Sequence, residues 1–223
     1  MTIHENLQKL RQEIPDIVKL VAVSKTKSVA EILEAYKAGQ TIFGENKVQE
    51  LVAKQMLLPE DIEWHFIGHL QTNKVRQVAS FINYIESIDS LKLLIEINKE
   101  AQKNNRMINC LLQFHIASEE TKFGLDKESA RCLLDSKEFS GMRNIRIKGV
   151  MGMATFCTDP EVIRTEFRML KQYFTLLKQE YFMNSTEFRE LSMGMSGDYR
   201  IAIEEGSTMV RIGTAIFGDR ISN

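Results

Sequence analysis

One lysine of this sequence lies where a reactive amine is expected. Lys25 follows the apolar run 20–23 (Leu-Val-Ala-Val), which is typical of a buried strand. A lysine just beyond such a strand can project into a partly desolvated pocket, where burial lowers its pKa and exposes a nucleophilic amine. Lysines in such places form Schiff bases with carbonyl compounds. The alternative is a solvated loop lysine, and the position of Lys25 alone does not decide between the two.

Two segments near the end of the chain combine glycines with hydroxyl side chains. They are 192–198 (Ser-Met-Gly-Met-Ser-Gly-Asp) and 211–218 (Arg-Ile-Gly-Thr-Ala-Ile-Phe-Gly). Bare backbone amides at a turn or a helix start bind phosphate, and Ser196 and Thr214 would add hydroxyl donors. The alternative is that these glycines only form tight turns.

An amine and a phosphate cradle together define the ligand that would fit them. A ligand with an aldehyde at one end and a phosphate at the other satisfies both, and pyridoxal 5'-phosphate has this structure. Arg211 would then face the ring nitrogen. A guanidinium donates a hydrogen bond but does not give up its proton, so it favours modest chemistry over a strong electron sink.

Two further polar residues follow the second and third strand-like runs. Asn46 comes after Gly44-Glu45 and could donate to a ligand oxygen, or it could cap the helix expected over 47–55. His69 could stack on a ligand or bond to it, or it could cap a helix or lie between layers.

Strand-like and helical patterns alternate along the whole chain, which is typical of βα units around a parallel sheet. The expected strands number eight: Lys19 to Ser24, Thr41 to Gly44, Trp64 to Gly68, Asn83 to Ile88, Met107 to Ile116, Ile147 to Ala154, Phe188 to Ser192 and Met209 to Gly213.

Helix signals separate these strands. Ser28 and Glu31 form a capping box, Asp159-Pro160 starts a helix that runs to Lys178, and either Asp89 or Ser90 caps a helix over 91–103. We expect a helix after every strand except the last.

This order predicts a single α/β domain over 1–223, a (β/α)8 TIM barrel preceded by an extra helix from Thr2 to about Ile14. An open doubly wound sheet is the alternative. In a barrel, the carboxyl ends of the strands form the active site, and the loops after strands seven and eight commonly bind phosphate.

Composition excludes several classes of protein. The net charge is -1, from 29 basic and 30 acidic residues, which gives no basic footprint for nucleic acid. No apolar stretch approaches the roughly 18 residues that cross a bilayer, and the first residues lack the apolar core of a signal peptide. Three widely spaced cysteines, Cys110, Cys132 and Cys157, indicate a reducing cytoplasm and no zinc site.

Five stretches of the sequence resemble the pyridoxal phosphate homeostasis protein family (the YggS and PROSC type). They are 21–27 (VAVSKTK), 43–50 (FGENKVQE), 64–74 (WHFIGHLQTNK), 191–196 (LSMGMS) and 206–218 (GSTMVRIGTAIFG). They occur in the order of that family and span almost the whole chain.

The resemblance implies a fold-type-III barrel similar to the N-terminal domain of alanine racemase, with the cofactor in Schiff-base linkage to Lys25. It also implies phosphate contacts from the Ser192 to Ser196 loop and from Gly213-Thr214, Arg211 at the ring nitrogen and Asn46 near the ring. We favour Ser196 over Ser192 because it lies nearer the barrel mouth. Lys122, in Thr121-Lys122-Phe123-Gly124, is either a second amine at the mouth or a solvated lysine.

Members of this family buffer and deliver pyridoxal phosphate without robust catalysis. Alanine racemases add a tyrosine from a further β-domain of the partner subunit, and this chain ends at Asn223. We therefore expect a cytoplasmic, monomeric carrier whose exchange partners are pyridoxal phosphate-dependent apo-enzymes or vitamin B6 salvage enzymes. The alternatives are a small racemase-like enzyme and a Schiff-base aldolase that uses the lysine without a cofactor.

Overall fold

Eight parallel strands close into a barrel in chain order, β1 to β8, in the part of the chain that the structure describes. The structure, a computed structural model, describes residues 2–118 and 123–218. The strands are β1 (Lys19–Val23), β2 (Ile42–Glu45), β3 (Glu63–Phe66), β4 (Tyr84–Ile88), β5 (Ile108–Phe114), β6 (Ile145–Gly152), β7 (Glu190–Ser192) and β8 (Met209–Ile212).

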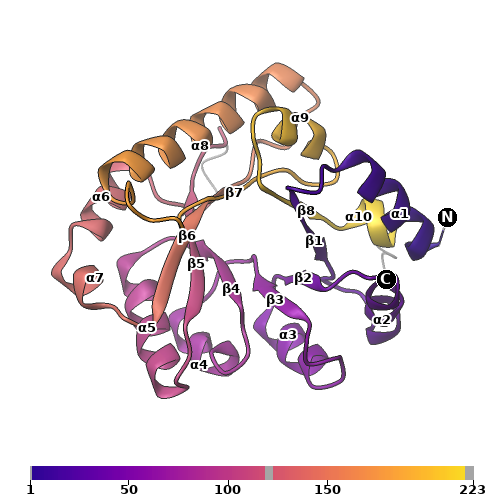
Figure 1. Cartoon of the computed structure of the whole chain (residues 1–223), viewed down its shortest axis with the longest axis horizontal. Helices are drawn as coiled ribbons and strands as arrows, with labels where there is room; N and C mark the ends of the chain where they lie inside the picture. Colours follow the sequence, from indigo (N-terminus) through magenta and orange to yellow (C-terminus); the bar gives the residue numbers. More distant parts are fainter. Residues whose placement is uncertain (1, 119–122, 219–223) are drawn as a thin grey trace.

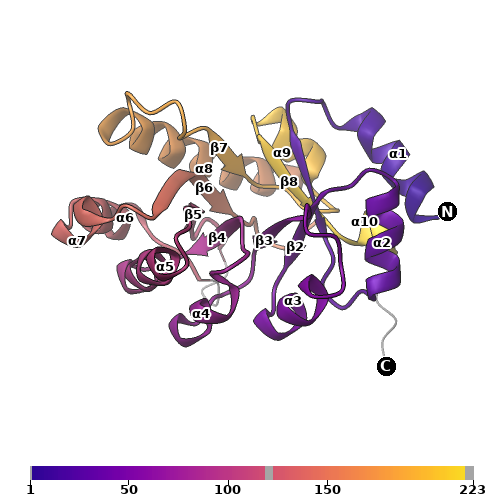
Figure 2. The ribbon, with the colours of Figure 1, turned by 60° about the horizontal axis from the view of Figure 1, so that its bottom comes forward.

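Helices surround the barrel on its outside (Figures 1 and 2). They are α1 (Ile3–Glu13), α2 (Val29–Lys37), α3 (Val48–Gln55), α4 (Val75–Val78), α5 (Leu91–Lys103), α6 (Lys127–Leu134), α7 (Lys137–Gly141), α8 (Pro160–Glu180), α9 (Tyr199–Glu204) and α10 (Thr214–Phe217), with a 3-10 turn, η1 (Thr72–Lys74), before α4.

β1 closes the barrel by pairing with β8, so the alternative of an open sheet is wrong. Lys19 is level with Met209 and Ala22 with Ile212. The first and last strands are therefore neighbours, and the loops that follow them emerge side by side. This register places the lysine loop beside the second glycine-rich segment.

Side chains alternate between the helix layer and the barrel interior along each strand. On β3, Trp64 packs against Phe43 with ring centroids 6.0 Å apart, within the apolar layer beneath the helices. The next residue, His65, faces inward, where it stacks on Tyr84 at 4.4 Å. The interior is polar along part of its length, and this polar part lies below the mouth.

The extra N-terminal helix was expected from the sequence, and it braces the last two βα units. Asn6 donates to the carbonyl of Ile216 in α10 at 2.9 Å. Glu13 accepts hydrogen bonds from the Tyr199 hydroxyl and from Arg200, both in α9. α1 therefore holds the two short helices whose preceding loops carry the glycines.

Local signals predicted most helix starts correctly. Ser28 and Glu31 form the capping box of α2, and Asp159 caps α8. Ser90, rather than Asp89, caps α5. The expectation that no helix follows the last strand is wrong, because α10 occupies residues 214–217. A helix this short has too few apolar positions to show a period in the sequence.

Candidate cofactor site

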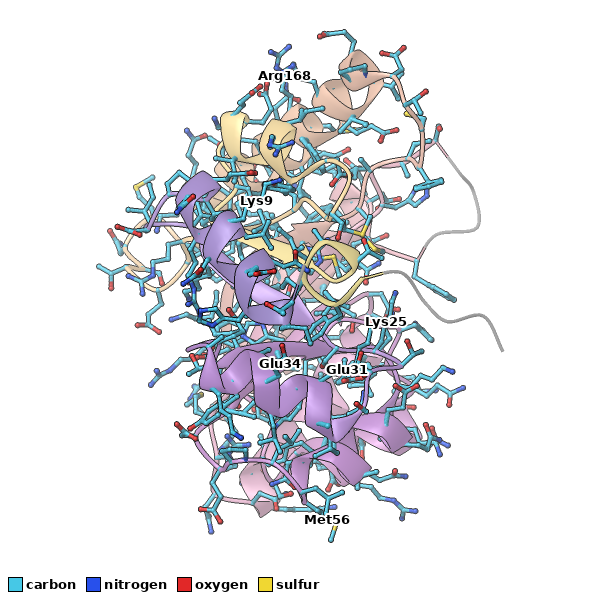
Figure 3. All side chains as sticks on the ribbon, turned by 90° about the vertical axis from the view of Figure 1, so that its right-hand side faces the viewer. Lys9, Lys25, Glu31, Glu34, Met56 and Arg168 are labelled. Carbon is cyan, nitrogen blue, oxygen red and sulfur yellow. The ribbon has the colours of Figure 1, made fainter. Side chains whose placement is uncertain are left out.

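Lys25 follows the carboxyl end of β1, two residues after Val23. Two-residue alternation relates it to Lys19, whose Nζ lies 2.7 Å from Glu190 and above the Tyr84 ring inside the barrel. Lys25 is half-buried. In Figure 3 it lies between α10 and the start of α2 near Glu31. Lys25 therefore lies at the carboxyl end of the barrel, beside the loops that follow β1 and β8.

A buried ion pair holds the chain just behind this lysine. Lys54 of α3 donates to the Ser24 carbonyl at 2.8 Å and to Glu45 Oε1 at 2.7 Å. The Ser24 hydroxyl donates to the same Glu45 oxygen at 2.6 Å. Burial raises the pKa of Glu45, although its bonds to Lys54 and Ser24 oppose that rise. These contacts fix the carbonyl that directly precedes Lys25.

The turn after the lysine is held as well. Thr26 adopts a left-handed φ of 65°, which is unfavourable for a β-branched residue. Its amide donates to Glu50 Oε2 at 2.9 Å. Lys27 donates to the Phe217 carbonyl at 3.0 Å and lies 3.5 Å from Glu31. The amine of Lys27 therefore already bonds other residues of this protein.

Two backbone amides at the start of α10 point at one oxygen. The Ser196 hydroxyl accepts from the amide of Gly213 at 3.3 Å and from that of Ala215 at 3.4 Å. Both bonds are long, and an anionic oxygen would bind the same donors more strongly than a hydroxyl does. Thr214, between these two amides, is exposed. The last βα loop therefore presents an anion cradle at the mouth.

The loop after β7 is shaped by a glycine and an aspartate. Gly194 has a φ of +97°, and a Cβ on it would lie 2.6 Å from the Cβ of Ala202. Asp198 accepts from the Met195 amide at 2.5 Å. These constraints turn the chain so that the Ser196 hydroxyl meets the amides of the next loop.

The lysine and the cradle belong to neighbouring strands. A Cβ built on Gly213 would lie 3.2 Å from the carbonyl of Val23, two residues before Lys25. A ligand seated on the Gly213 amide therefore lies beside the end of β1.

Arg211 lies deeper in the barrel on the same strand as the cradle and is buried. Its Nη2 donates to the Gly152 carbonyl at 2.9 Å, and its Nη1 donates to the Ser192 hydroxyl at 2.5 Å. Ser192 in turn donates to Glu86 Oε2 at 2.6 Å. Burial lowers the pKa of Arg211, and the charge of Glu86 opposes that shift. Ser192 thus contacts Arg211 and Glu86, whereas Ser196 contacts the cradle.

Asn46 does not cap a helix, because α3 begins at Val48 and Lys47 occupies the cap position. Its Oδ1 is buried and, within the described chain, has no hydrogen-bond partner. An unsatisfied buried amide oxygen is costly unless a ligand or water meets it. Asn46 also lines a shallow cavity of about 210 Å³ together with His69.

His69 makes contacts that the sequence did not predict. It stacks on Phe123 at 4.1 Å and hydrogen-bonds Asp89 at 3.0 Å through Nδ1. It therefore links the loops after β3, β4 and β5 at the rim of the mouth. Lys122, the other candidate amine, lies outside the described residues.

Sequence reasoning missed the buried charged residues that support the site. Lys54 and Glu45 lie behind Lys25, and Glu86 and His65 lie beneath Arg211. The signal that could have revealed them is a charged residue within an otherwise apolar strand, as in residues 84–88 (Tyr-Ile-Glu-Ser-Ile). No group of three or more potential metal ligands occurs among residues 2–118 and 123–218.

Lys25 after β1 and the two converging amides after β8 lie at the carboxyl end of a parallel barrel, the end at which such barrels carry their ligand sites. The model of the alanine racemase N-terminal domain matches residues 1–221. A curated relative from Synechocystis sp. is 40% identical, over 93% of this chain and 94% of its own length. Another, from Haemophilus influenzae, is 39% identical, over 99% of this chain and 97% of its own length. Both are named pyridoxal phosphate homeostasis protein. The chain therefore belongs to the alanine racemase N-terminal domain family, within the pyridoxal phosphate homeostasis proteins.

Solved structures agree with this assignment. PipY of Synechococcus elongatus, solved with PLP bound, is 36% identical over 97% of this chain and all of its own, with a TM-score of 0.87. Alanine racemase of Clostridium difficile has a TM-score of 0.74 at 12% identity and matches over 57% of its length, so it shows the fold alone. The sequence prediction of the family and of the TIM barrel is confirmed. None of the helices described here is long and apolar enough to span a membrane.

Proposed function

We propose that this protein is a single-domain, monomeric, cytoplasmic carrier of pyridoxal 5'-phosphate, which it holds as a Schiff base with Lys25 and exchanges within the cell. The observation that carries the proposal is the pair of amides from Gly213 and Ala215 that converge on one oxygen beside β1, the strand that Lys25 follows. The names of the relatives and the PLP bound to PipY support the choice of ligand.

The described side chains fit this cofactor. The cofactor supplies an aldehyde that condenses with an amine, and a phosphate ester on a methylene of the adjacent ring carbon. Lys25 and the amides of Gly213 and Ala215 follow two neighbouring strands, which suits a ligand whose aldehyde and phosphate are close together. Asn46 supplies a buried oxygen that still needs a partner.

We assign the ligand contacts as follows. The phosphate takes the place of the Ser196 hydroxyl on the two amides, and Ser196 and Thr214 contribute hydroxyl donors. Arg211 donates to the ring nitrogen and cannot protonate it. The role proposed for Ser192 is to hold the Arg211 guanidinium, because its hydroxyl already bonds Arg211 and Glu86.

The tyrosines of this chain support a carrier rather than a racemase. Proton transfer on both faces of a substrate needs a second acid or base opposite the lysine. The sequence has five tyrosines, and each makes its contacts elsewhere. Tyr36 bonds Asp61, Tyr84 stacks on His65, Tyr173 stacks on Phe114, Tyr181 packs against Phe182, and Tyr199 bonds Glu13.

The test combines a lysine pair with isotope exchange. Lys25→Ala should lose the visible absorbance of bound pyridoxal phosphate, while the matched variant Lys27→Ala should keep it. The protein should exchange the Cα hydrogen of L-amino acids with deuterium no faster than free cofactor does. Rapid exchange would support the racemase-like alternative, and absence of any absorbance band with added cofactor would support a Schiff-base aldolase. We propose apo-enzymes that need the cofactor, or vitamin B6 salvage enzymes, as its exchange partners.

A further inference from the structure

A chain of hydrogen bonds crosses the barrel interior from Arg211 to the closed end. Ser192 links Arg211 to Glu86 Oε2. Glu86 Oε1 lies 2.6 Å from His65 Nδ1, and His65 Nε2 lies 3.1 Å from Glu63 Oε1. His65 and Glu86 are fully buried, whereas the Glu63 side chain is 36% exposed. The chain thus connects a buried arginine to solvent at the opposite end of the barrel.

The donors and acceptors of this chain fit an arrangement in which Glu86 and Glu63 are ionised and His65 is protonated. A guanidinium only donates, so Ser192 accepts from Arg211 and must give its single proton to Glu86. Glu86 accepts this proton at Oε2, and as a carboxylate it also accepts at Oε1 from His65 Nδ1. Since Glu63 faces the other ring nitrogen, two ionised acceptors require both nitrogens of His65 to carry protons.

The charges of the chain alternate and cancel. In this ionised arrangement Arg211 and His65 are positive, Glu86 and Glu63 are negative, and each positive group lies between or beside negative ones. Burial alone lowers the pKa of His65, but its bonds to Glu63 and Glu86 outweigh burial and raise it. Burial likewise raises the pKa of Glu86, but its contacts with His65, Arg211 and Ser192 bring it below the ordinary value.

Other charged and titratable groups face this chain from the neighbouring strands. They are Tyr84 on β4, Lys19 on β1, Glu190 on β7 with Arg189 beside it, and Asp198 in the loop after β7, whose charge acts on Arg211. Lys19 and Glu190 pair with each other at 2.7 Å, so they add no net charge. The charges along Arg211, Glu86, His65 and Glu63 therefore still alternate in sign when these neighbouring groups are included.

We propose that Glu86, held by protonated His65, is a positioning residue for Arg211, and that it sets the place of the guanidinium at the ring end of the cofactor site. The inference rests on the proposed function for the identity of the ligand, but not for the state of His65. Ser192 carries the contact, because the Glu86 carboxylate is 3.8 Å from Arg211 Nη1 and reaches it through the hydroxyl.

The matched variants are Glu86→Gln and Glu190→Gln. Both carboxylates are buried on interior strands, but Glu190 pairs with Lys19 and does not touch Arg211. If Glu86→Gln does not fold, Ser192→Ala breaks the same link and loses only a hydroxyl. In each case the amide or the alanine is close in size to the residue it replaces.

The first measurement uses protein without added cofactor. Imidazole 15N NMR, assigned with a His65→Gln variant, should show both nitrogens of His65 protonated at pH 7.5. Glu86→Gln should lower the titration midpoint of His65 by at least about one pH unit, the equivalent of one lost ionic hydrogen bond. Glu190→Gln should leave the two-nitrogen signature in place. A neutral His65 at pH 7.5 in the unaltered protein, or the same midpoint in Glu86→Gln, overturns the inference.

The second measurement uses added pyridoxal phosphate. Glu86→Gln should keep borohydride trapping on Lys25 but bind about tenfold more weakly, a loss typical of removing an outer partner of a ligand-holding side chain, and its absorbance maximum should move. Glu190→Gln should match the unaltered protein in both. Identical affinity and spectrum in the two variants would reject the positioning role. Failure of the unaltered protein to trap cofactor would reject the proposed function and leave the NMR test standing.

Discussion

Replacing Lys54 by methionine tests whether a buried ion pair holds the lysine loop. Methionine keeps the length of the side chain but removes the charge. Lys54 and Glu45 are 10% and 0% exposed in their side chains, and their atoms are 2.7 Å apart. In Lys54→Met, Glu45 would keep only the Ser24 hydroxyl, and its second oxygen already lacks a partner within the described residues.

The burial of the Lys54–Glu45 pair determines how much stability Lys54→Met should lose. Removing one partner of a buried pair costs about 3–5 kcal/mol, because the remaining charge is left without compensation. Lys54 also lies 3.4 Å from Glu50, which is partly exposed, so some of the lost interaction is screened. We therefore expect Lys54→Met to lower the free energy of unfolding by about 3 kcal/mol at pH 7.5.

The pH dependence gives a second signature with a definite sign. The pKa of Glu45 is already above its ordinary 4.5 in the folded protein, and loss of Lys54 raises it further. A raised folded pKa means that the folded state binds the proton more tightly than the unfolded state. The cost of Lys54→Met, measured against the unaltered protein at each pH, should therefore shrink as the pH falls from 7.5 towards 5.

Urea unfolding followed by circular dichroism at several pH values measures this cost. Glu45→Gln/Lys54→Met should recover most of the stability, since it leaves no buried charge. A cost below about 1 kcal/mol, or one that is the same at pH 5 and pH 7.5, would show that the pair is effectively solvated and would refute the argument.

Three further changes test the mouth itself. Ser196→Ala should weaken cofactor binding about tenfold, the equivalent of one charge-assisted hydrogen bond; equilibrium dialysis measures this, and unchanged affinity would remove Ser196 from the phosphate site. Gly194→Ala should cost about 1–3 kcal/mol in urea unfolding, because its Cβ meets Ala202 at 2.6 Å and its φ is +97°; a variant as stable as the parent would contradict the turn geometry. Arg211→Lys should shift the absorbance of the bound cofactor through loss of the planar donor; an unchanged spectrum would place the guanidinium away from the ring.

The barrel could be predicted from the sequence because each strand is a short apolar run between clear helix signals. Ser28 with Glu31 and Asp159 before Pro160 start helices in the structure as they do in the sequence. α10 escaped prediction because four residues cannot show a helical period.

The sequence predicts site residues at the ends of the strands, but it cannot predict the contacts that support them. The position of Lys25 just past an apolar strand led to the prediction that it projects into the mouth. The sequence could not predict that Lys54, a residue of α3, would reach back to the Ser24 carbonyl, because that contact joins a side chain to the backbone 30 positions away. The pairing of Glu86 with His65 is likewise set by the stagger of β3 and β4.

Borohydride reduction of the protein with bound pyridoxal phosphate, followed by peptide mapping, tests the central claim most directly. It reports ligand, linkage and residue together. The account predicts one pyridoxyl group per chain, on the peptide that contains Lys25. A pyridoxyl group on Lys27 or Lys122 instead, or no trapped cofactor at all, would contradict it.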